Sequence, residues 1–145
     1  TVIKELLGRH KKNKKELERI DRELERLYGR LEDVQIVSGK VTKSSDDFPY
    51  IEEHISVKVP EPAESTKLKK RIREKEIRRK KVLAEIEEVE EFIDRMSEGV
   101  DKQIFEMIYM DGMTQKEVGD IIHLERSGIS KKISAIIEDS QRSHF

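Results

Sequence analysis

The chain has 145 residues, of which 42% are charged and 5% are aromatic, and its formal net charge is −1. This composition favours long solvated helices over a thick globular core, and it gives no overall electrostatic attraction to nucleic acid. Cysteine is absent, which excludes disulfide bonds and cysteine-ligated zinc and fits a reducing compartment. No apolar run approaches the roughly 18 residues of a membrane span, and no signal peptide is visible. We therefore expect a cytoplasmic protein.

Residues 3–34 carry a seam of side chains at alternating spacings of three and four, which predicts one long helix of a coiled coil. The seam consists of Ile3, Leu6, His10, Asn13, Leu17, Ile20, Leu24, Leu27, Leu31 and Val34. Two of these residues, His10 and Asn13, are polar. We expect Asn13 to face water in a frayed first part of the helix. The alternative is a buried polar residue that sets the register of the helices.

Residues 38–60 interrupt the helical pattern with a segment that is rich in Ser, Gly, Asp and Pro. Alternating apolar residues then predict a short strand that ends at the following prolines; they are Ile55, Val57 and Val59. Because a single strand is not stable alone, it would pair with residues 36–41 as a small ribbon or lie along the helices. We interpret this β-like insert as a connector rather than a ligand site.

A second long helix is predicted from about Glu64 to Ser97, with Gly99 as its stop. Its charges are strongly segregated along the sequence. Residues 67–81 hold ten Lys and Arg against two Glu, whereas residues 82–98 hold seven acids against one Arg.

This segregation predicts that the two long helices form an antiparallel hairpin. In that arrangement the basic stretch 67–81 lies beside the acidic residues 16–33, and the acidic stretch 82–98 lies beside the bases of residues 9–15. A parallel pair would oppose like charges. Exposed ion pairs contribute little energy, so they select the orientation while burial of the leucine seam supplies stability. We interpret the basic run as a solvated helix face, with a phosphate contact left open.

The sequence of the last third of the chain predicts three short helices. Asp101 to Tyr109 forms the first, with Ile104, Phe105 and Ile108 on one face, and Asp111–Gly112 makes a turn. Thr114 and Glu117 then have the spacing of a capping box at a helix start. The apolar stripe of this second helix consists of Val118, Ile121 and Ile122.

A break at residues 123–126 separates this second helix from a last amphipathic run. The apolar positions of the last run are Ile129, Ile133, Ile136 and Ile137. Between them lie short or basic side chains, the types that reach base edges and phosphates in a DNA major groove. Two short amphipathic helices with this spacing predict a helix-turn-helix, although they could also pack as an ordinary bundle.

The segment TQKEVGDIIHLERSGISKKI resembles region 4 of sigma factors, and it looks most similar to small phage transcriptional regulators of the RinA and ArpU type. The stretch SSDDFPYIEEHISV, residues 44–57, also resembles the middle of RinA-type proteins. Two positions depart from the pattern. Gly119 stands where Ala is usual, and Glu125 stands where Ser, Asn or Asp usually caps the recognition helix, which would loosen that start or move it to Ser127.

Nine residues of this segment are predicted to contact double-stranded DNA. The start of the first helix of the pair would contact phosphate through Thr114, Gln115 and Lys116. The second helix would read bases through Arg126, Ser127, Ser130 and Lys131, with Lys132 and Ser134 on the flanking backbone.

Nothing in the sequence assembles a catalytic or metal site. The four His residues lack the H-x-x-x-H and H-E-x-x-H spacings of zinc sites, and no GxGxxG, GxxxxGK[ST] or GxSxG motif occurs. Adjacent carboxylates such as Asp46 and Asp47 lie on opposite sides of an extended chain. We therefore expect a protein that is not an enzyme and that needs neither cofactor nor metal.

The sequence thus predicts an all-α protein in two parts. Residues 1–98 form a long antiparallel coiled-coil hairpin with the insert 38–60, and residues 99–145 form a tri-helical helix-turn-helix domain. The expected function is sequence-specific DNA binding in transcription regulation, and the resemblance implies a phage late-gene activator in the bacterial host cytoplasm. Two alternatives remain open: a coiled-coil interaction protein that binds RNA polymerase or another protein, and a phage terminase small subunit. The coiled coil could also mediate homo-oligomerisation.

Overall fold

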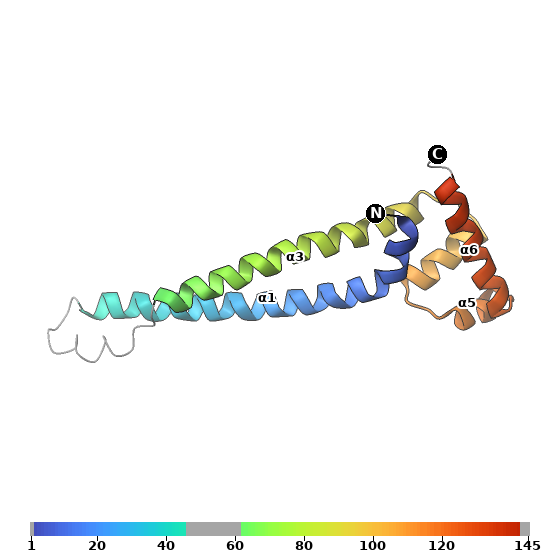
Figure 1. Cartoon of the computed structure of the whole chain (residues 1–145). Coiled ribbons are helices and arrows are strands. Elements are labelled where there is room, and N and C mark those ends of the chain that lie inside the picture. The colour runs from blue at the N-terminus through green and yellow to red at the C-terminus, as the bar shows by residue number, and fades with distance from the viewer. Residues whose placement is uncertain (1, 46–61, 143–145) are drawn as a thin grey trace. The chain divides into compact units, whose positions relative to one another are not determined.

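The computed structural model describes residues 2–45 and 62–142 of the chain (Figure 1). They form α1 (Ile3–Ser45), α3 (Pro62–Asp94), α4 (Val100–Phe105), the π-helical segment η1 (Glu106–Met110), α5 (Gln115–Ile122) and α6 (Arg126–Arg142). No strand occurs among these residues, which confirms the predicted all-α class. Within the same ranges, no helix combines the length and the apolar character that crossing a membrane requires.

Helix α1 continues through residue 38 to Ser45, so it is longer than the sequence pattern predicts. The predicted break at residue 38 and the predicted ribbon strand at 36–41 are therefore wrong. A glycine such as Gly39 costs only about 1 kcal/mol in a helix interior, and extending a helix that already exists avoids the cost of a new nucleus. The rest of the predicted β-like insert, residues 46–60, lies outside the described residues.

The contacts divide the chain into two compact units, each of which contains part of both long helices. Unit 1 comprises Thr1–Leu17 and Lys81–Phe145, and unit 2 comprises Glu18–Lys80. The domain boundary predicted at residue 98 falls inside unit 1. Each unit has its own buried apolar residues.

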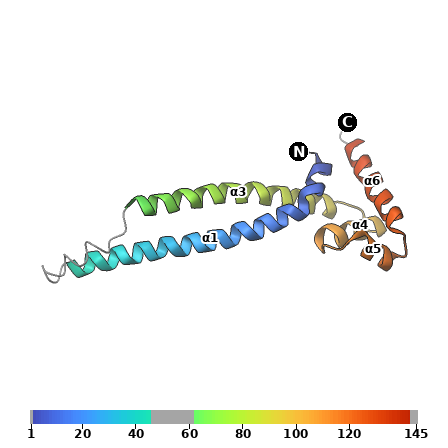
Figure 2. The same ribbon diagram turned by 60° about the horizontal axis from the view of Figure 1, so that its bottom comes forward.

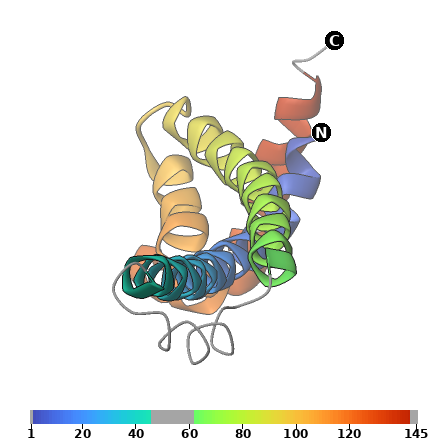
Figure 3. The same ribbon diagram turned by 90° about the vertical axis from the view of Figure 1, so that its left-hand side faces the viewer.

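In unit 2, α1 and α3 run antiparallel and side by side (Figures 1 and 3). Apolar side chains of both helices are buried between them: Ile20, Leu24, Leu27, Leu68 and Ile72. Two ion pairs flank this seam. Arg79 Nε lies 2.6 Å from Asp21 Oδ1, and Lys75 Nζ lies 3.0 Å from Glu23 Oε2. The basic stretch of α3 therefore faces acidic residues of α1 in this unit.

Unit 1 has one hydrophobic core to which α1, α3, α4, η1, α5 and α6 all contribute side chains. Figure 2 shows the ribbons of these segments. Its buried members are Leu6, Leu7, Val89, Ile93, Ile104, Phe105, Val118, Ile129 and Ile133. Phe105 is fully buried, and its ring centroid lies 6.1 Å from that of Phe92 and 5.4 Å from that of Tyr109. The first turns of α1 and the end of α3 therefore share their core with α4, α5 and α6.

Asn13 is buried in unit 1, so the expectation that it faces water in a frayed helix start is wrong. Its Nδ2 donates to Glu85 Oε1 at 3.1 Å, and the Arg9 guanidinium donates to both oxygens of the same carboxylate at 3.0 and 2.7 Å. The hydrogen bonds from Arg9, with a further one from Asn13, lower the pKa of Glu85. Asn13 keeps a partner when buried, as buried polar groups in folded proteins usually do.

Candidate nucleic-acid interface

The capping box predicted at the start of α5 is present. Thr114 has extended backbone angles, and its Oγ1 accepts a hydrogen bond from the Glu117 amide at 3.2 Å. The Glu117 carboxylate in turn accepts one from the Thr114 amide at 3.4 Å. This reciprocal pair satisfies two of the amides that a helix start leaves without partners. It fixes where α5 begins, with the predicted phosphate contacts Gln115 and Lys116 in the first turn.

Replacing Thr114 by alanine is expected to lower the free energy of unfolding by about 1 kcal/mol, because the side-chain oxygen of the cap is lost. Thr114→Ser keeps that oxygen and is the matched control. Urea denaturation followed by far-UV circular dichroism measures both variants. Equal loss of stability in the two variants would mean that the hydroxyl group does not cap α5.

The turn between α5 and α6 is tight and depends on two residues. His123 adopts the left-handed conformation with φ 66° and ψ 44°, and the amides of His123 and Leu124 both donate to the Gly119 carbonyl. Gly119 is buried, and a Cβ atom added to it would collide with the Leu124 carbonyl oxygen. The turn therefore approaches α5 more closely than the alanine usual in region-4-like sequences would allow.

Helix α6 begins at Arg126, one turn before its first buried residue, Ile129, whose amide donates to the Glu125 carbonyl at 3.1 Å. Glu125 is thus the last residue before the helix, and the start is not shifted to Ser127. Six of the predicted DNA-contacting residues are exposed along the first three turns: Arg126, Ser127, Ser130, Lys131, Lys132 and Ser134. Ser127, Ser130, Lys131 and Ser134 recur on one side of the helix, whereas Arg126 precedes Ile129 and Ile133 by three and seven residues and lies at the exposed first turn of their side.

Lys132 is separated from the other predicted residues of α6. Its Nζ lies 3.6 Å from Asp101 Oδ1 at the start of α4, and both side chains are about half exposed. An ion pair of this exposure is weak, so a phosphate could replace Asp101 as the partner of Lys132. The residue occupies the edge of α6 that faces α4 rather than the face that carries Ser127 and Lys131.

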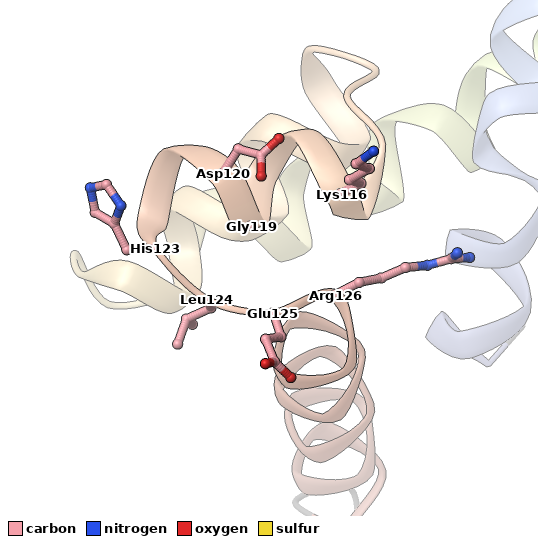
Figure 4. Close-up of a pocket in the computed structure, with 7 residues that line it drawn as sticks. All are labelled: Lys116, Gly119, Asp120, His123, Leu124, Glu125 and Arg126. Carbon is pink, nitrogen blue, oxygen red and sulfur yellow. The ribbon is translucent and has the colours of Figure 1, made fainter.

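An open pocket of about 470 Å³ lies between α5 and the start of α6 (Figure 4). Two bases, Lys116 and Arg126, and two acids, Asp120 and Glu125, line it with Gly119, His123 and Leu124. In Figure 4 the side chains of Lys116 and Arg126 lie on one side of this pocket, and His123 lies on the other. The formal charges of the lining cancel, so an anion would be attracted to the end that holds the two bases.

Lys14 supports the turn that leads into α5, a role that the sequence did not reveal. Its Nζ donates to the carbonyls of Tyr109 and Met110 at 2.8 and 3.2 Å. These carbonyls end η1, and carbonyls at helix ends need partners from outside the helix. The sequence pattern placed Lys14 among bases that face the acidic stretch of α3. No local signal links residues that are 95 positions apart.

Comparison of the chain with protein-family models, curated proteins and solved structures gives no significant match. In the part of the chain that the structure describes, no group of three or more His, Cys, Asp or Glu side chains could hold a metal ion.

Proposed function

We propose that this chain is a sequence-specific DNA-binding regulator of transcription in which α5, the turn and α6 act as a helix-turn-helix. The resemblance of its last third to region 4 and to RinA- and ArpU-type regulators suggests a phage late-gene activator. In this proposal α1 and α3 form a coiled-coil hairpin that supports the helix-turn-helix domain. The chain is not an enzyme and uses no cofactor.

The observation that carries the proposal is the exposed polar face of α6. Ser127, Ser130 and Lys131 project from its first turns, with Arg126 beside them, while Ile129 and Ile133 on the other side are buried. Short hydroxyl side chains and bases at the start of a helix can reach base edges in a major groove. The tight turn at Gly119 and His123 holds α5 against this helix, as two-helix DNA-binding motifs require.

Each predicted residue has a role in this proposal. Thr114, Gln115 and Lys116 contact phosphate from the start of α5, where helix amides favour anions. Arg126, Ser127, Ser130 and Lys131 read bases. Ser134 and Lys132 contact the flanking backbone, and Lys132 leaves Asp101 to do so.

Selection of bound fragments from genomic DNA with the purified chain tests the proposal and supplies a specific site. On that site, Arg126→Ala and Lys131→Ala are each expected to cost about 1–3 kcal/mol and to relax the sequence preference, because a base contact is lost. Lys12→Ala removes a charge that is also exposed, from α1, and is the control. Unchanged specific affinity in both α6 variants would exclude α6 as the recognition helix.

The salt dependence of binding gives a second test. Because the net charge is near zero, affinity must come from local bases such as Lys116, Arg126 and Lys131. Neutralising four to six phosphates predicts a slope of log K against log salt of roughly −4 to −5 for duplex DNA. Fluorescence anisotropy titrations at several salt concentrations measure it. If no duplex binds even at low salt, the proposal fails and a protein-binding function takes its place.

One observation favours protein binding as the second candidate function. Ile121 is 53% exposed on α5 and Leu124 is 37% exposed in the turn, which places two apolar side chains beside the candidate interface. A protein partner such as RNA polymerase would use them as anchors, whereas phosphate would not. Ile121→Ser should leave the affinity for DNA unchanged and lower the affinity for such a protein partner.

A further inference from the structure

One side of α3 in unit 2 carries exposed bases that the packing of the helices does not use. They are Lys69, Lys70, Arg73 and Lys80, and we call them the basic face. None of them makes an ion pair with a described residue. Two other bases of the same helix, Lys75 and Arg79, are paired with Glu23 and Asp21 of α1. The structure thus separates the bases that join the helices from those that do not.

The spacing of the basic face places it beside the buried seam, on an exposed side of α3. Positions 69, 73 and 80 are separated by four and seven residues, so they recur on one side of a helix. Leu68 and Ile72, which directly precede two of these positions, are buried. Of the two acids in this stretch, Glu76 accepts a hydrogen bond from Tyr28 and lies on the same side of the helix, three residues after Arg73 and four before Lys80. Glu74 lies four residues after Lys70. The four bases of the basic face outnumber these two acids. The surplus positive charge of residues 67–81 therefore remains on an exposed surface after the pairing with α1.

We infer that the basic face binds the sugar–phosphate backbone of duplex DNA as a second, sequence-independent contact. This inference rests on the proposed function, since it assumes that duplex DNA is the ligand. Lys69 and Lys80 are separated by about 16 Å along the helix axis at 1.5 Å per residue. Duplex DNA presents a charge about every 3.4 Å per strand. A stripe of this length meets several phosphates of one strand, and each contact releases a counterion.

The exposed Ile77 distinguishes DNA from a protein partner at this surface. Ile77 lies within the basic face and is 66% exposed. An acidic protein segment would bury this side chain, whereas a phosphate backbone gains nothing from it. Ile77→Ser is therefore expected to leave DNA affinity unchanged.

The test compares two triple variants of the full chain on the selected DNA site. The first, Lys69→Gln with Arg73→Gln and Lys80→Gln, removes three charges from the basic face. The second, Arg19→Gln with Arg22→Gln and Arg26→Gln, removes three exposed charges from α1 in the same unit. In the wild type the hydrogen bond from Lys75, and also the charges of Arg26 and Arg19, lower the pKa of Glu23. The magnitude of the salt slope should fall by about 2–3 in the first variant, at about 0.9 per phosphate lost. It should change by less than about 1 in the second, and sequence preference should be kept in both.

Charge-preserving replacement gives the rescue control: Lys69→Arg with Lys80→Arg should keep the wild-type slope. Thermal melting by circular dichroism should be the same for the first triple variant and the wild type, since the replaced side chains are exposed. An unchanged slope in the first variant, or equal falls in both triple variants, overturns the basic-face contact. If the wild type binds its site with sequence preference in any of these cases, the proposed function survives; if it binds no duplex, both fail.

Discussion

Replacing Leu6 by alanine is expected to destabilise α5 and α6, although Leu6 lies more than a hundred residues before them in the sequence. Leu6 is 1% exposed and belongs to the core that contains Val118 and Ile129. Truncating a buried leucine removes its transfer free energy and leaves a cavity, which together cost about 2–5 kcal/mol. The core of unit 1 is shared, so this loss is felt by every helix that borders it.

Hydrogen exchange of individual amides measures this loss of stability within α5 and α6. The amides of Val118 and Ile129 donate to Thr114 and Glu125 carbonyls, at 3.0 and 3.1 Å. In Leu6→Ala both should exchange at least about 30-fold faster at the lower limit of 2 kcal/mol. Leu24→Ala is the matched control, because Leu24 is buried on the same helix but in unit 2. Unchanged exchange in Leu6→Ala would show that α1 does not contribute to this core.

Replacing Gly119 by alanine is expected to destabilise the chain by about 1–3 kcal/mol, which is typical of a side chain forced into filled space. The added Cβ would meet the Leu124 carbonyl oxygen, which belongs to the backbone and cannot rotate away. The clash outweighs the helix propensity of alanine, which would otherwise add about 1 kcal/mol. Because the turn must open, the start of α6 should move, and affinity for the selected DNA site should fall as well.

Gly128→Ala is the matched control for this effect. A Cβ at Gly128 meets only the Leu124 Cβ, at 4.0 Å, so this variant should be as stable as the wild type or more stable by up to about 1 kcal/mol. Urea denaturation compares the two variants. If both glycines tolerate alanine equally, α5 and the turn do not approach as closely as described.

The local features of the fold could be predicted from the sequence because their signals lie within a few residues. The capping box joins Thr114 to Glu117, and the seam of residues 3–34 repeats every three or four positions, so both are visible without knowledge of the rest of the chain. The all-helical class follows from such periodic patterns. The exposure of Ser127 and Lys131 also follows, since the apolar positions of α6 define its buried side.

Only the tertiary structure decided which apolar faces meet and which polar groups they enclose. A periodic pattern identifies a buried side of a helix but not the helix that covers it, so the shared core of Leu6, Val118 and Ile129 was not predictable. The burial of Asn13 depends on Glu85, and the ion pair of Lys132 depends on Asp101. The extension of α1 to Ser45 was missed for a related reason. Residue propensities are weak, and a long helix that is already nucleated and packed carries residues that would not form a helix alone.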